Sequence, residues 1–299
     1  MRRSTAALAA ACLAAGLLAA CSEPEPIAVQ EPTASRPPAP PATSTSPPSP
    51  APSSTTPTPE PPPLGTVPPP WLGTRVLPEG PDGFGEIRPT PPALRDRRFT
   101  LPDQLPELPG RAFASRVVSP PPADVIARST WRTGCPVGVD DLAWIRLTFR
   151  GFDDQRHTGE LLANASVADH LVSVFRRLYA ARFPIEEMTI STRADQDAPP
   201  TGDGNATEVF NCRPTTGGTS YSQHAYGLAI DVDSFQNPYV KGDLVLPELA
   251  SSYLDRDDVR PGMIEPGDEV VRAFAAIGWE WGGDWQSLKD YQHFSQNGT

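Results

Sequence analysis

The chain has 299 residues and a formal net charge of −11 at neutral pH. Of its 39 prolines, 19 fall in residues 22–70, a stretch of mostly Pro, Ser, Thr and Ala that cannot bury enough apolar surface to offset the entropy of folding. Residues 123–299 hold 26 acidic and 15 basic side chains, so the net charge belongs to the C-terminal part. We expect one folded domain and no nucleic-acid partner, because phosphate binding requires clustered Lys and Arg.

The N-terminus has the features of an export signal. Two arginines precede an apolar run at residues 6–20 that is too short to span a bilayer. The Leu-Ala-Ala-Cys sequence ending at Cys21 resembles the lipobox of bacterial lipoproteins, whose signal is cut before the cysteine that then carries lipid. The resemblance implies a signal peptide at residues 1–20, lipidation of Cys21 and an extracytoplasmic protein held on the outer face of the cytoplasmic membrane. An ordinary signal peptide that contains a cysteine is the alternative.

Residues 21–109 are expected to form the lipidated cysteine and a disordered, proline-rich linker. The tract at 22–70 would span about 40 Å as a coil and at most about 150 Å as polyproline II. From residue 71 the chain remains rich in proline but gains scattered apolar residues, which predicts an extended lead-in that packs in part on the domain. The domain itself is expected at residues 110–299.

Two cysteines, Cys135 and Cys212, remain in the chain after Cys21. In an oxidising compartment two such thiols most often pair, so we expect a disulfide bond between them. A zinc site that uses both cysteines is the competing interpretation.

Within the domain, apolar and polar residues alternate over 143–149, which predicts a half-buried strand. Ser166 and Asp169 have the spacing of a capping box, and helical spacing of apolar residues continues to about Phe183 before Pro184. Residues 188–192 are predicted to form a strand.

The second half of the domain begins with a loop-like stretch at residues 195–220. Strands are predicted at 228–232, 279–281 and 292–295, and a helix at 266–277. Helices and strands mix without a βαβ rhythm, so the prediction is a single α+β domain with a small mixed or antiparallel sheet and flanking helices. We expect it to be a monomer.

The chain has four histidines, of which His157 and His170 lie in polar surroundings and are expected to have no functional role. His224 precedes a short apolar run that ends in Asp231, and His293 follows Asp290 by three residues. Two imidazoles and one carboxylate are a common catalytic zinc set that leaves the fourth position for water. A nearby carboxylate could then accept a proton from that water. A histidine packed against an aspartate for structural reasons is the alternative.

The segment SQHAYGLAID, residues 222–231, resembles the S-x-H-x-x-G-x-A-x-D motif of the bacterial zinc D-alanyl-D-alanine carboxypeptidases, a family that includes phage L-alanyl-D-glutamate endolysins. The later segment GWEWGGDWQSLKDYQHF is similar to the family's second motif. The resemblance covers about residues 130–299 and implies a peptidase that acts on peptidoglycan stem peptides. It further implies a Zn²⁺ ion with Asp290 as general base and with three protein ligands: His224, Asp231 and His293.

The same resemblance implies an arginine upstream of the first motif that binds the scissile carbonyl or its oxyanion. Arg193, at the end of a predicted strand, is the expected counterpart, and Arg213, beside Cys212, is the other candidate. Ser222 is expected either to bind the substrate backbone or only to form a turn. Trp281 and Trp285 either line the substrate groove or belong to the core.

The expected function is therefore D-alanyl-D-alanine carboxypeptidase-like hydrolysis of stem peptides. The alternatives are an L-alanyl-D-glutamate endopeptidase acting on the same substrate and a non-catalytic, zinc-containing module that binds the cell wall. A serine hydrolase built on Ser222 and His224 is a further alternative, but no G-x-S-x-G nucleophile elbow surrounds Ser222.

Overall fold

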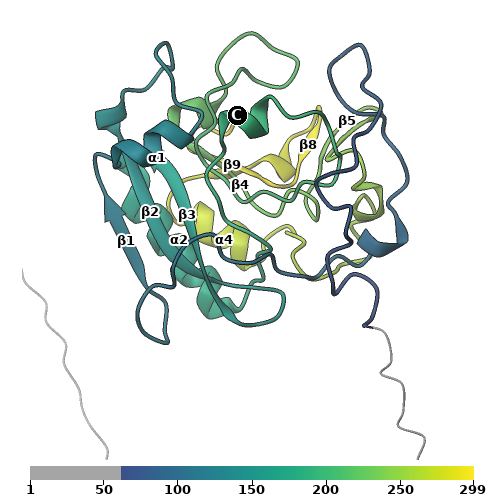
Figure 1. Cartoon of the computed structure of the whole chain (residues 1–299), viewed down its shortest axis with the longest axis horizontal. Coiled ribbons are helices and arrows are strands. Elements are labelled where there is room, and N and C mark those ends of the chain that lie inside the picture. The colour runs from purple at the N-terminus through teal and green to yellow at the C-terminus, as the bar shows by residue number, and fades with distance from the viewer. Residues whose placement is uncertain (1–61) are drawn as a thin grey trace, which may run out of the picture. The chain divides into compact units, whose positions relative to one another are not determined.

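The longest strands belong to a three-stranded antiparallel sheet formed by β1 (Ser115–Val118), β2 (Leu142–Arg150) and β3 (Arg156–Asn164), in that order (Figure 1). The computed structural model describes residues 62–299, so the expected signal peptide, Cys21 and most of the proline-rich tract lie outside the described residues. The strand predicted at 143–149 is confirmed as β2. Its apolar positions all face the core: Ala143, Ile145, Leu147 and Phe149.

Helix α2 (Ala168–Ala181) packs against β2, and α4 (Glu269–Ala275) packs beside α2 (Figure 1). Both predicted helices are thus confirmed, but the predicted capping box is wrong. The side chain of Asn164 accepts a hydrogen bond from the Ser166 amide, which places residue 166 in a 3-10 turn before the helix instead of at its cap.

Two smaller antiparallel sheets carry the C-terminal half. One has the order β4 (Ala229–Asp231), β9 (His293–Ser295), β7 (Glu280–Trp281), and these strands confirm the three predicted at 228–232, 279–281 and 292–295. The other has the order β6 (Leu244–Leu246), β5 (Tyr239–Lys241), β8 (Lys289–Asp290). The predicted α+β class is confirmed.

Residues 188–192, predicted as a strand, belong to no β-ladder. Met188 accepts a hydrogen bond from the Glu160 amide, but the following residues lead directly into the short helix α3 (Arg193–Gln196). Thr192 and Asp195 form a capping box there, which ends the extended segment. The remaining helical segments are α1 (Ala123–Arg128), η1 (Pro92–Leu94), η2 (Val139–Asp141), η3 (Ala165–Val167), η4 (Gln223–Tyr226), η5 (Ser251–Tyr253) and η6 (Gly282–Asp284).

The lead-in at residues 62–109 is irregular, but it is packed into the domain. Leu94 is fully buried in a cluster with Phe235 and Tyr253. The buried Arg97 guanidinium donates two hydrogen bonds to the Glu186 carboxylate, at 2.6 and 2.7 Å. Packed structure therefore begins before the domain boundary expected at residue 110. Contacts of this kind need no helical or strand periodicity, so the sequence pattern did not reveal them.

No helix within residues 62–299 has the length and apolar character needed to cross a membrane.

If the lead-in is part of the core, Leu94→Ala should lower the free energy of unfolding by about 2–5 kcal/mol, as truncations of buried leucines do. Leu64→Ala is the matched control, since that side chain is 68% exposed and its loss should change stability by no more than about 0.5 kcal/mol. Urea denaturation of the two variants measures both values. Equal stabilities would contradict the packing of the lead-in.

Candidate metal centre

The first motif forms a short helix that begins and ends at motif residues. The Ser222 hydroxyl accepts a hydrogen bond from the His224 amide and caps the 3-10 helix η4. Gly227 ends this helix at φ 67°, and a Cβ atom there would lie only 2.4 Å from the Asn164 amide nitrogen. Glycine is therefore required at this position. The serine and the glycine together fix the turn that presents His224.

The pairing of β4 with β9 supplies the other two motif side chains. Asp231 is the direct cross-strand partner of His293, and Ile230 pairs with Phe294 beside it. Directly opposed residues place their side chains on the same face of a sheet. The carboxylate from the first motif and the imidazole from the second are thereby brought together.

Three ligand atoms converge at this point. His224 Nε2 lies 3.2 Å from His293 Nδ1 and 3.3 Å from Asp231 Oδ1, and the last two atoms are 3.1 Å apart. All three residues are buried. Tetrahedral coordination with bonds of about 2.0–2.1 Å separates neighbouring ligand atoms by about 3.3–3.4 Å, which is close to this triangle.

The second nitrogen of each imidazole faces a main-chain oxygen. His224 Nδ1 lies 2.7 Å from the Val209 carbonyl oxygen, and His293 Nε2 lies 3.3 Å from an oxygen of Thr299. A neutral ring that donates its N–H to that oxygen directs a lone pair from the other nitrogen into the triangle. Three buried acceptors then face one another, an arrangement that a divalent cation would stabilise. The donor set therefore fits a metal ion.

The charges within the triangle are strongly coupled. Burial alone would raise the pKa of Asp231, but the two histidines outweigh burial and hold the pKa of this carboxyl far below its usual range. Burial would lower the pKa of His293, yet Asp231 outweighs burial and raises it above the ordinary value. In the absence of a cation, the carboxylate and a protonated imidazole stabilise each other.

Asp290 adds a second carboxylate near the three ligands. Burial raises the pKa of Asp290 to about 6, and the charge on Asp231 adds to the rise. The Gln292 amide donates to Asp290 Oδ1 at 3.1 Å. Gly282 makes room for this residue, because a Cβ atom at position 282 would lie 2.6 Å from the Asp290 main-chain oxygen.

A cavity of about 880 Å³ is lined by the three ligands and Asp290. Of the two candidate arginines, Arg213 lines this cavity. Arg193 is exposed at the start of α3, where its guanidinium lies 3.5 Å from the Ala127 carbonyl oxygen, and it is not among the cavity-lining residues.

The remaining predicted residues divide between cavity, core and surface. Trp281 is only 4% exposed, donates from Nε1 to the Tyr291 carbonyl oxygen at 2.8 Å and packs in the core, away from the cavity lining. Trp285 lines the cavity, with its ring 5.4 Å from that of His293. Ser222 lines the cavity as well as capping the helix. His170, as expected, is exposed on α2.

His157, expected to have no functional role, lies on β3. Its imidazole faces two carboxylates, with Nδ1 2.8 Å from Asp103 and Nε2 3.1 Å from Asp153. These contacts tie the lead-in and the β2–β3 turn to the strand.

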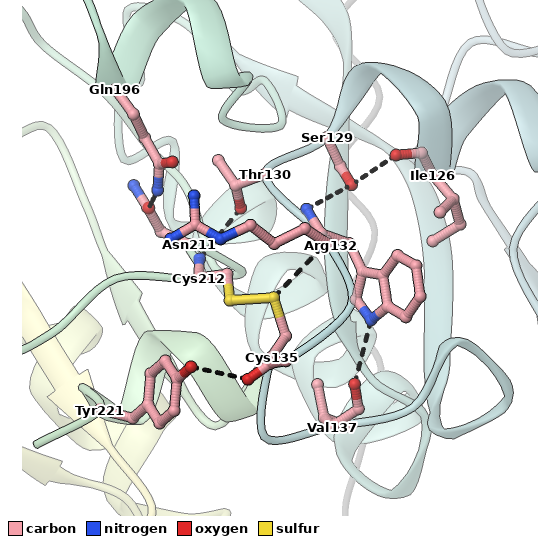
Figure 2. The surroundings of a disulfide bond; sticks show 12 residues. Ile126, Ser129, Thr130, Arg132, Cys135, Val137, Gln196, Asn211, Cys212 and Tyr221 are labelled. Atoms are coloured by element: carbon pink, nitrogen blue, oxygen red, sulfur yellow. Dashed lines mark hydrogen bonds between the residues drawn. A yellow bond between two sulfur atoms is a disulfide. The ribbon is translucent and has the colours of Figure 1, made fainter.

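Cys135 and Cys212 form a disulfide bond, as predicted (Figure 2). Around it, the Cys212 amide donates to the Thr130 hydroxyl at 3.0 Å, and the Tyr221 hydroxyl donates to the Gly134 carbonyl at 2.6 Å. The bond therefore anchors the segment that supplies Arg213, and a disulfide is typical of an oxidising compartment.

Residues 209–211, just before and next to Cys212, hold His224 through main-chain contacts. The Asn211 amide donates to the His224 carbonyl at 3.1 Å, and Val209 supplies the oxygen that faces His224 Nδ1. Val209 acts through its main chain, so nothing in its side chain signals this role in the sequence.

Residues 216–296 match a family model described as D-alanyl-D-alanine carboxypeptidase. The matched segment contains the three candidate ligands and Asp290, whereas both candidate arginines and the disulfide lie before it. Similarity to this family is thus confirmed over this segment. No solved structure matches the chain at a significant level.

We expect the purified chain to bind one divalent ion per molecule. His224→Ala and His293→Ala should each lose the ion, because either change removes one corner of the triangle. His170→Ala is the control and should keep it, since His170 is exposed on α2. Metal affinity should fall as the pH falls, because the raised pKa of His293 favours the protonated ring, which cannot bind metal. Elemental analysis checks the assignment, and full occupancy in the His224→Ala/His293→Ala double variant would contradict it.

Proposed function

We propose that the chain is a zinc-dependent peptidase that hydrolyses peptidoglycan stem peptides, most simply as a D-alanyl-D-alanine carboxypeptidase. The observation that carries this proposal is the triangle of His224, Asp231 and His293 with Asp290 beside it on one cavity. All four residues lie in the segment that matches the carboxypeptidase family. A module that only binds the cell wall would have no need of a second carboxylate at this position.

His224, Asp231 and His293 would hold the zinc ion. When bound, zinc polarises a peptide carbonyl and activates water for attack. Asp290 accepts the proton of the attacking water and passes it to the departing amine. Oδ1 of this carboxylate accepts a hydrogen bond from the side-chain amide of Gln292, which orients the group.

Arg213 is the residue we propose for the carbonyl oxygen that gains negative charge. It lines the cavity, and the neighbouring disulfide fixes its main chain. Its guanidinium donates to the Pro214 carbonyl at 3.2 Å, so the side chain would turn from that contact towards the substrate, where its charge would stabilise the developing oxyanion. Arg193, the counterpart expected from the resemblance, is not among the residues that line the cavity.

The cavity gives a reason to keep L-alanyl-D-glutamate endopeptidase as a second candidate. Its volume of about 880 Å³ is near the upper end of the range of about 300–1,000 Å³ usual for ligand pockets. A terminal alanine would fill only a small part of it. The cavity could therefore accept peptide on both sides of a scissile bond.

We further propose that the protein is exported, lipidated at Cys21 and active as a monomer outside the cytoplasmic membrane. The disulfide between Cys135 and Cys212 supports export, because such bonds persist in oxidising compartments. The lipobox-like sequence at Cys21 supports the anchor.

Digestion of purified muropeptides by the full chain, followed by mass spectrometry, tests the function. Loss of one terminal alanine identifies the carboxypeptidase, and release of a peptide cut after L-alanine identifies the endopeptidase. Asp290→Asn should retain zinc and lower turnover by about 10²–10⁴-fold, the usual contribution of general acid–base catalysis. Its amide is similar in size to the carboxylate but cannot accept the proton.

Asp231→Asn is the matched control, because a neutral amide is a poor zinc ligand and this variant should lose metal as well as activity. Zinc content and kcat are measured together on both variants. Near-normal turnover in Asp290→Asn would overturn the assigned base. If Asp290→Asn loses zinc while Asp231→Asn keeps it, Asp290 is the zinc ligand and Asp231 is the base.

A further inference from the structure

The cavity has a wall that comes from the lead-in, far from the metal ligands in sequence. Residues 77–86, termed the strap, fold back on themselves, and Gly83 and Phe84 line the same cavity as the candidate metal site. We propose that the strap is part of the substrate-binding site and that Phe84 selects for longer stem peptides. This inference rests on the proposed function and adds a residue that determines specificity.

The strap is a defined turn. The Gly80 amide donates to the Phe84 carbonyl at 2.7 Å, and the Glu86 amide donates to the Pro78 carbonyl at 2.8 Å. These two bonds close the loop, and Phe84, which is half-buried, directly follows the turn at residues 80–83. The main chain of Phe84 is therefore held in place.

The strap is also fastened to the rest of the domain at both ends. The Leu77 amide donates to the Pro200 carbonyl at 2.8 Å, and the Gly85 amide donates to Glu248 Oε1 at 2.6 Å in a buried contact. Leu77 is 3% exposed and packs so closely that a Cβ atom on Gly202 would lie 2.5 Å from its Cδ1 atom. The part of the cavity wall that the strap forms is thus held in place by contacts with the rest of the domain.

The two parts of the cavity differ in chemistry. The metal ligands and Asp290 supply charge at the proposed reaction centre. The strap supplies an aromatic ring and main chain. Near its anchors the cavity is lined by the apolar Pro200, Leu246 and Pro247 and by Glu248, whose carboxylate accepts from the Gly85 amide. A peptide cut at the metal centre could place a more distant residue against Phe84, whereas a short fragment would end before it.

The test compares two probes on the full chain loaded with zinc: the stem pentapeptide and the shortest fragment of it that the wild-type chain hydrolyses. Phe84→Ala should lower the ratio of kcat/KM for the pentapeptide to kcat/KM for the fragment by about tenfold, the scale of one lost apolar contact with a bound ligand. The loss should appear in KM more than in kcat, because the ring contacts substrate away from the reacting atoms.

Ile87→Ala is the matched control, because this apolar residue follows the strap directly, is 38% exposed and lies outside the cavity lining. It should leave the ratio unchanged. Phe84→Leu keeps an apolar side chain and should restore most of the ratio. If Phe84→Ala does not fold, Phe84→Ser, which also removes the apolar side chain, serves as the test variant. An unchanged ratio in Phe84→Ala or Phe84→Ser, or an equal loss on both probes, would overturn the role of the strap while leaving the peptidase proposal intact. Failure of the wild-type chain to hydrolyse either probe would instead overturn the proposed function.

Discussion

The site depends on one cross-strand pair, Asp231 opposite His293, which joins the two motifs of the sequence. This pair sets two corners of the ligand triangle, and the capped turn before Gly227 brings His224 to the third. Main-chain oxygens face the outer nitrogen of each imidazole, so neutral rings can direct their lone pairs inward. Since buried acceptors that face one another are costly without a cation, this pairing gives the fold a site suited to a metal ion.

The candidate site was more accessible to prediction than the surrounding fold, for a physical reason. The ligands act through their side chains, so residue type and spacing made them candidates, and the resemblance of both motifs to the carboxypeptidase family then favoured a metal site over a structural contact between histidine and aspartate. The support for His224 from Val209 is a main-chain contact and leaves no trace in side-chain chemistry. Strand β3 was missed because both of its faces are covered, which removes the alternation that revealed β2; even Glu160 is buried there, paired with Arg128.

The packing of the lead-in, residues 62–109, was likewise not visible in the local sequence pattern. Its prolines predict an extended segment that packs only in part on the domain, yet Leu94 and Arg97 are as buried as residues of the regular core. Contacts of this kind depend on which distant residues meet, and a local pattern does not contain that information. The contribution of the lead-in extends from stability to the cavity, where the strap adds Phe84 to a wall otherwise formed by the C-terminal half. The disulfide fixes the segment between α3 and the first motif.

The central claim is that His224, Asp231 and His293 form a metal site, and anomalous X-ray diffraction from zinc-loaded crystals of the protein tests it most directly. The account predicts one strong anomalous peak above the zinc edge, bonded to His224 Nε2, Asp231 Oδ1 and His293 Nδ1 at about 2.0–2.2 Å. A peak at another set of residues, or zinc bound through the outer nitrogen of either histidine, would contradict the account.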